Sequence, residues 1–199
     1  MQKDEPRPCS RYTISPTETL ADLARIYEID REAYGDDNVS FAVLRDWWQS
    51  APHGHFNIRK SGSAPIGALG IWPVTRESFD LLARGRITEE GVVVAEDCGD
   101  TEERWLYLSG IVIAPHARKT PASFCLLRGV FDYWRRHQAF QAMRWHVGAV
   151  PITRAGERLL ARYGFALSVL AHDRNSPYPF SQREFGASSE SLDKEDKRS

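Results

Sequence analysis

Residues 104–137 constrain the fold of this chain more than any other stretch, because they read as a strand, a short basic turn and an amphipathic helix. The segment 105–113 is rich in aromatic and β-branched residues and breaks at Ala114-Pro115, which is typical of a largely buried strand. Beyond the turn, apolar side chains recur at helical spacing, namely Phe124, Leu127, Phe131 and Trp134. The pattern therefore predicts a strand–turn–helix unit.

The turn itself has the features of an anion site. Thr120-Pro121 is a helix-start signal, with Thr as the N-cap and Pro at the first helical position. Arg118 and Lys119 directly precede it, and a helix N-terminus adds free N–H groups and a partial positive charge. We expect a phosphate-binding turn here. The alternative is that Thr120-Pro121 only caps a helix that packs on the core.

Composition narrows the class of protein. The chain has 199 residues, of which 42% are hydrophobic and 27% charged, as expected for one globular domain with its own core. The formal net charge of -1 provides no basic field for nucleic acid or an anionic membrane. No apolar run approaches the ~20 residues that span a bilayer, and the N-terminus lacks a signal-peptide core. We expect no nucleic-acid or membrane partner.

The three cysteines, Cys9, Cys98 and Cys125, are odd in number and share no spacing typical of metal ligands. The simplest interpretation is reduced thiols in a cytoplasm and no metal site. Cys125 falls within the expected helix, which favours a small buried hydrophobe over a nucleophile.

The N-terminal half predicts a loose arm at residues 1–9, followed by a short strand at 11–15. Ser15-Pro16-Thr17-Glu18 then signals the start of a helix that ends at Gly35-Asp36-Asp37, and a second helix follows at 41–49. Two strands come next, at 55–60 and 65–74, and the Ser61-Gly62-Ser63 turn between them favours an antiparallel pair.

The remaining elements alternate. We expect a helix at 77–84, a strand at 87–96, strands at 142–150, 165–171 and 180–185, and a helix at 153–163. The tail at 186–199 has almost no apolar residues, which predicts disorder. The fold class is therefore α/β (α+β), with one mixed domain over residues 10–185.

Two features allow more than one interpretation. The paired Trp47 and Trp48 are typical of core or lid packing, and the alternative is an aromatic pocket for an acceptor. The acidic residues between Glu89 and Glu103 suit a solvated loop and strand edge, or they attract a cationic amine substrate.

Two stretches, IVIAPHAR at 111–118 and ITRAGERLLARYGF at 152–165, resemble the GNAT superfamily of N-acyltransferases when read with the order of elements. In that family the fourth strand leads through a pyrophosphate-binding turn into the third helix, and a "GF" step closes the fourth helix. The resemblance implies a single GNAT-like domain. Its central sheet is mixed and mostly antiparallel, has splayed fourth and fifth strands, and is flanked by helices.

The resemblance also implies a ligand, acetyl-CoA or another acyl-CoA, as co-substrate. The backbone of Ile111, Val112 and Ile113 would pair with the pantetheine arm, and Gly110 would mark the bulge typical of the family's fourth strand. One backbone donor near this bulge would stabilise the developing oxyanion. The pyrophosphate would lie on the turn, at Arg118, Lys119, Thr120, Ala122 and Ser123.

The sequence departs from the family pattern in three places. The two glycine positions of the turn hold Pro121 and Ser123, which removes one N–H donor and adds bulk near the ligand. The position where the family often has a tyrosine, four residues before the glycine of the "GF" step, is Leu160, and Tyr163 points in a different direction. The central strand has no glutamate to serve as general base.

Several residues are candidates for the missing acid and base. His146, on the expected fifth strand, suits a base near neutral pH, and the alternative is a packing histidine. Tyr107 and Ser109 share one face of the central strand and could orient the acceptor or protonate the thiolate, although Tyr107 equally suits the core. Glu96 and Asp97 are further candidates for the general base, if the acidic segment lines the cleft that binds the substrates.

The resulting expectation is an acyl-CoA-dependent N-acyltransferase in which a small-molecule or protein amine attacks the thioester directly in a ternary complex. One alternative is a catalytically degenerate relative that binds a ligand or partner. Another is an acyltransferase with an acyl carrier protein as donor. The sequence is compatible with a homodimer.

Overall fold

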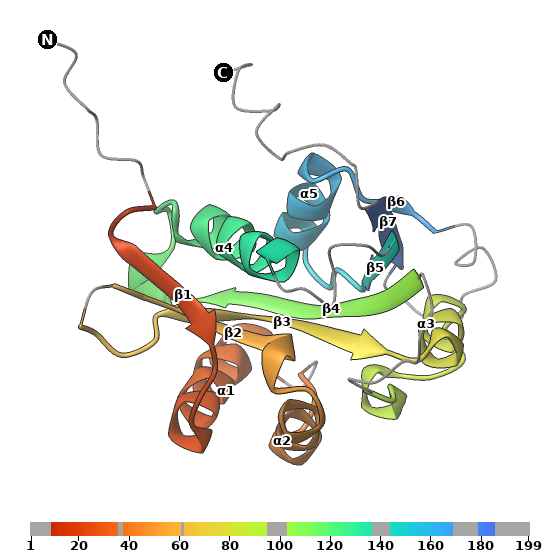
Figure 1. Cartoon of the computed structure of the whole chain (residues 1–199), viewed down its shortest axis with the longest axis horizontal. Coiled ribbons are helices and arrows are strands. Elements are labelled where there is room, and N and C mark those ends of the chain that lie inside the picture. Colours follow the sequence, from red (N-terminus) through yellow and green to blue (C-terminus); the bar gives the residue numbers. More distant parts are fainter. Residues whose placement is uncertain are drawn as a thin grey trace, which may run out of the picture. The chain divides into compact units, whose positions relative to one another are not determined.

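The computed structural model describes residues 9–35, 38–60, 62–94, 103–136, 144–168 and 179–185. Seven strands form one sheet in the order β1-β2-β3-β4-β5-β7-β6 (Figure 1). The strands are β1 (Tyr12–Pro16), β2 (His55–Lys60), β3 (Gly67–Val74), β4 (Glu103–Ile113), β5 (Arg144–Ala149), β6 (Ala166–Leu167) and β7 (Ser181–Phe185). The helices are α1 (Leu20–Tyr34), α2 (Phe41–Ser50), α3 (Arg76–Ala83), α4 (Ala122–Arg136) and α5 (Arg154–Arg162), with 3-10 turns η2 (Pro52–Gly54), η3 (Glu89–Gly91) and η4 (Pro115–Ala117).

The sheet is mixed and mostly antiparallel. β4 and β5 run parallel, in a register from Glu103–Arg144 to Leu108–Ala149. The pairs β1–β2, β2–β3, β5–β7 and β6–β7 are antiparallel, which confirms the hairpin predicted at 55–74. The predicted α+β class, with a GNAT-like mixed sheet, is therefore confirmed. None of the helices in the described ranges is both long and apolar enough to cross a membrane.

The chain divides into two compact units. The first, unit 1, comprises Met1–Gly70 and Gly110–Tyr133. Its sheet is covered on both faces, with α4 on one face and α1 on the other (Figure 1). On the α4 face the Phe56 ring meets the Tyr133 ring edge-on at 5.0 Å. On the α1 face, Ala68 packs with Ile26 and Ile29 of the helix. Ala68 pairs with Asn57 of β2, so Asn57 lies on the α1 face, whereas its neighbour Phe56 lies on the α4 face.

The second, unit 2, comprises Ile71–Ser109 and Trp134–Ser199. One face of its sheet is covered by α3, whose Phe79 packs against Phe180 with ring centroids 5.3 Å apart. A Cβ added at Gly148 would overlap both of these rings, so Gly148 lies on the α3 face. Its register partner Tyr107 shares that face. On the opposite face Trp145 meets Trp134 at 6.0 Å.

Two predictions of secondary structure are wrong, the start of the first helix and the strand at 87–96. Ser15 and Pro16 do not open a helix, because they extend β1 and pair with β2, and the helix begins after Thr19, whose hydroxyl caps the Asp22 N–H. The strand predicted at 87–96 is a 3-10 turn followed by one isolated bridge, Val74–Val94, within its described part. The residues at 95–96 and the predicted tail at 186–199 lie outside the described residues.

The prediction of three reduced thiols is also wrong, because Cys9 and Cys125 form a disulfide. The two cysteines are separated by 116 positions in the sequence. Such a pairing has no local sequence signal, since only the folded chain brings the start of β1 beside the first turn of α4. Cys125 is nevertheless buried, as predicted, with 1% of its surface exposed.

Candidate functional site

Strand β4 runs from unit 2 into unit 1, and the residues predicted to bind pantetheine, Ile111–Ile113, lie in its unit 1 part. The register with β5 ends at the Leu108–Ala149 pair, whereas β4 continues to Ile113. The Ala114 N–H donates to the Ile66 carbonyl over 2.8 Å, so position 114 points its backbone groups toward β3. Because backbone groups alternate in direction along a strand, the carbonyls of Ile111 and Ile113 point away from β3.

Side chains of this chain already engage those two carbonyls. The Tyr34 hydroxyl donates to the Ile111 oxygen over 2.9 Å, and the Arg118 Nε donates to the Ile113 oxygen over 3.0 Å. Val112, between them, is buried against Ile26 and Ile29. A pantetheine arm that pairs with Ile111 and Ile113 would therefore share or replace these two contacts.

The turn after β4 is organised by Thr120. Its hydroxyl donates to the Ala117 carbonyl over 2.7 Å and accepts from the Ala122 N–H at 3.3 Å. Ala122, predicted as a diphosphate donor, is fully buried, and its N–H is engaged by this cap. Lys119 has φ 63°, in the left-handed region that non-glycine residues seldom adopt. The strained backbone points to a turn whose shape is imposed by its surroundings.

The charges of the turn remain available to a ligand. Arg118 and Lys119 are exposed, Ser123 is half-buried, and all three lie within one turn of the α4 start. Two cations beside a helix N-terminus favour a dianionic group. The predicted phosphate-binding residues lie together in this turn, and three of them already use a donor within the chain, namely Ala122, Thr120 and the Nε of Arg118.

Unit 2 holds the predicted catalytic residues on its α3 face. Tyr107 is buried with 1% exposure, and its hydroxyl donates to the carboxylate of Glu89, in the η3 turn. The Ser109 hydroxyl accepts from the Trp72 Nε1–H over 2.9 Å. Because Tyr107 and Ser109 alternate with Leu106 and Leu108, they share a face, as predicted.

His146 lies on the same face, since its register partner is Trp105, two residues before Tyr107. Its ring stacks on the Trp105 ring at 5.4 Å, with an angle of 10° between the planes. The Nδ1 atom is 3.2 Å from a Glu184 carboxylate oxygen and Nε2 is 3.7 Å from a Glu103 oxygen. Two carboxylates, one beside each ring nitrogen, hold this half-buried imidazole in a fixed orientation.

Glu89 is the residue that sequence reasoning missed as a site component. It belongs to the acidic segment that the sequence favoured as a solvated loop, and its contact with Tyr107 depends on the turn after α3. Tyr107 and Glu89 are 18 residues apart and belong to different elements, so no local sequence pattern indicates that they form a hydrogen bond. The candidate bases Glu96 and Asp97 lie outside the described residues.

Other candidates have structural roles. Leu160, at the position of the family tyrosine, is buried with 6% exposure. Trp47 is buried and the indole N–H of Trp48 donates to the Thr17 carbonyl over 2.9 Å, so both tryptophans pack in unit 1. A Cβ at Gly110 would meet nothing within 4 Å. No cluster of three or more His, Cys, Asp or Glu side chains suited to a metal ion exists within the described part of the chain.

Searches with family models and against curated protein sequences found no match. Solved structures, in contrast, match over most of the chain. A chain of the NatC complex bound to Gag peptide and CoA superposes with a TM-score of 0.58 at 12% identity, covering 88% of this chain and 98% of that one. A GNAT-family acetyltransferase from Listeria monocytogenes gives 0.54 at 12% identity, covering 87% and 95%.

This chain has the GNAT acetyltransferase fold. A chain of the NatB acetyltransferase complex bound to CoA and MES gives the same result, with a TM-score of 0.55 at 7% identity and coverage of 86% and 97%. At such low identity the likeness concerns the fold, and the residues that would act in this chain have to be argued from its own geometry.

Proposed function

We propose that this GNAT-fold chain is an acyl-CoA-dependent N-acyltransferase, with acetyl-CoA as the simplest donor and an amine as acceptor. The observation that carries the proposal is the course of β4, which continues past its pairing with β5 and leads through a turn with two exposed cations into α4. GNAT-fold neighbours whose names include CoA add support.

In this proposal Arg118, Lys119 and Ser123 bind the diphosphate, and the backbone of Ile111–Ile113 pairs with pantetheine. The acceptor amine attacks the thioester carbonyl carbon, the C–S bond breaks, and the sulfur takes a proton as the nitrogen loses one. His146 accepts the amine proton, and Glu103 and Glu184 stabilise the imidazolium. Ser109 or the Tyr107–Glu89 pair supplies the proton to the thiolate.

A non-catalytic ligand-binding relative is the second candidate. It is favoured by the engaged Ala122 N–H and by Leu160 at the family's tyrosine position, because both remove groups that a catalytic site would use. An acyl carrier protein as donor is an alternative to CoA that uses the same turn.

Thiol release from acetyl-CoA with a panel of amines tests the enzymatic proposal. We expect turnover that falls about 100-fold or more in His146→Gln, since general acid–base groups contribute about that much. Tyr107→Phe and Ser109→Ala should each reduce it too, whereas Tyr163→Phe, a matched tyrosine in the turn after α5, should not. Binding of acetyl-CoA without turnover for any amine would favour the second candidate instead.

A further inference from the structure

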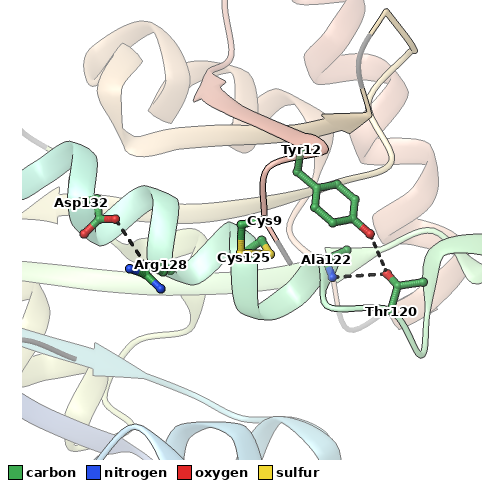
Figure 2. Close-up of a disulfide and its surroundings, with 7 residues drawn as sticks. All are labelled: Cys9, Tyr12, Thr120, Ala122, Cys125, Arg128 and Asp132. Atoms are coloured by element: carbon green, nitrogen blue, oxygen red, sulfur yellow. Dashed lines mark hydrogen bonds and ion pairs between the residues drawn. A yellow bond between two sulfur atoms is a disulfide. The ribbon is translucent and has the colours of Figure 1, made fainter. Parts of the chain in front are cut away.

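The Cys9–Cys125 disulfide lies beside the turn that we assign to the cofactor diphosphate (Figure 2). It joins the residue shortly before β1 to the first turn of α4, with the two Cα atoms 5.4 Å apart. Cys125 is buried and Cys9 is half-buried. Cys9 is therefore the more exposed of the two cysteines.

Hydrogen bonds complete a closed ring around this covalent link. The Tyr12 N–H donates to the Cys9 carbonyl over 3.0 Å, and the Tyr12 hydroxyl donates to Thr120 Oγ1 at 3.3 Å. On the other side, the Cys125 N–H donates to the Pro121 carbonyl over 2.9 Å. Figure 2 shows Tyr12 pointing at Thr120, and the Thr120 hydroxyl in contact with the Ala122 N–H.

The ring connects the redox state of the cysteines to the shape of the turn. The Thr120 hydroxyl accepts from the Ala122 N–H and donates to the Ala117 carbonyl. Contacts that fix the position of Thr120 therefore also restrain the backbone of the turn that carries the two cations. Without the disulfide, the Tyr12–Thr120 contact is the remaining polar side-chain link between the β1 start and the turn among the described residues. A single hydrogen bond at 3.3 Å restrains the turn less than a covalent bond does.

We propose that Cys9–Cys125 is a reversible thiol–disulfide site that controls how well the turn is ordered for acyl-CoA. The reductant is an external dithiol. Its thiolate attacks the Cys9 sulfur, Cys125 leaves as a thiolate and takes a proton, and the second thiol of the reductant closes its own disulfide and releases Cys9. The protein gains two thiols and the dithiol is oxidised. The identity of the ligand as acyl-CoA rests on the proposed function, whereas the effect of the disulfide on the order of the turn does not.

Hydrogen exchange and ligand affinity of the full-length protein test the two parts separately. The samples are the air-oxidised protein, the same protein with dithiothreitol, Cys9→Ser, and Cys98→Ser as the cysteine control. We expect faster amide exchange over residues 117–126 in the reduced protein and in Cys9→Ser. Acetyl-CoA should bind about five- to tenfold more weakly to both, since losing preorganisation of one or two side chains has about that effect. Oxidised Cys98→Ser should match the oxidised wild type.

Equal exchange and equal affinity in the oxidised protein and in Cys9→Ser would overturn the proposal. So would alkylation of Cys9 and Cys125 in air-oxidised protein without prior reduction, because it would show that the bond does not form. If exchange differs as expected and neither form binds acetyl-CoA, the redox control of the turn stands and the proposed cofactor is refuted.

Discussion

Two ionisable groups of unit 1, His55 and Asp30, should each make the stability of this protein depend on pH, and their opposite effects should largely cancel in the wild type. His55 is 3% exposed, its Nδ1 lies 2.7 Å from the Thr17 hydroxyl, and burial lowers its pKa from 6.5 to about 4. Asp30 of α1 is half-buried, and burial raises its pKa from 3.8 to about 7. The Asp30 Oδ1 atom has no hydrogen-bond partner among the described residues.

The two shifts act in opposite directions as the pH falls. His55 stays neutral in the native state, so the unfolded chain takes up the proton first, and stability is lost between pH 6.5 and about 4. Asp30 is protonated first in the native state, so stability is gained as the pH falls from about 7 to 3.8. At 1.36 kcal/mol for each pKa unit, the contributions are about 3 kcal/mol lost and about 4 kcal/mol gained.

Urea unfolding followed by tryptophan fluorescence, with the disulfide intact, tests this at about pH 7.5 and about pH 4.5. Relative to wild type, Asp30→Asn should lose about 3 kcal/mol more on acidification, because only the histidine effect remains. His55→Asn, which keeps a polar atom near the Thr17 hydroxyl, should gain about 3 kcal/mol relative to wild type over the same range. Three parallel pH profiles would refute the reasoning, since neither group would then have a shifted pKa.

Three further predictions concern packing and cross-links in unit 1. Gly67→Ala should lower the free energy of unfolding by about 2 kcal/mol or more, because the new Cβ would lie 2.6 Å from Ile113 Cδ1 and overlap the Val112 carbonyl oxygen. Gly110→Ala is the control in the same urea assay and should cost under about 1 kcal/mol, because its Cβ would meet nothing within 4 Å. Tyr34→Phe should cost about 1 kcal/mol through the lost bond to the Ile111 carbonyl, with Tyr27→Phe as the control; equal effects would contradict that role. Reduction should lower the free energy of unfolding of the wild type by about 2–5 kcal/mol and leave that of Cys9→Ser unchanged, because the variant has no Cys9–Cys125 bond to lose. If reduction destabilised the variant as much as the wild type, this bond would be excluded as the cause.

The elements with strong local patterns could be predicted from the sequence. The strand before Ala114-Pro115 and the helix after Thr120 follow from apolar periodicity and from turn chemistry, both of which depend on neighbouring residues. The shared face of Tyr107 and Ser109 follows from strand alternation alone. These are short-range consequences, and the structure agrees with them.

The parts that could not be predicted depend on long-range contacts. Ser15 and Pro16 carry a helix-start signal, yet pairing with Asn57 and Phe56 keeps them in a strand. The Cys9–Cys125 bond and the Tyr107–Glu89 contact join segments that only the folded chain brings together. Arg118 is a different case, because it reads as a free cation in the sequence and its Nε donates to the Ile113 carbonyl across the same local turn.

Calorimetric titration of the oxidised, full-length protein with acetyl-CoA tests directly whether the turn after β4 binds the cofactor. We expect one site with a Kd below about 100 μM. Replacing both Arg118 and Lys119 by Ala should raise the Kd about tenfold or more, because two charge-assisted contacts are lost. Replacement of Arg25 and Arg45, two exposed arginines of α1 and α2 that pair with acidic residues of their own helices, should leave the Kd unchanged. Absence of binding up to about 1 mM would show that acetyl-CoA is not the cofactor of this protein, since a cofactor used by the native protein has to bind it within that range.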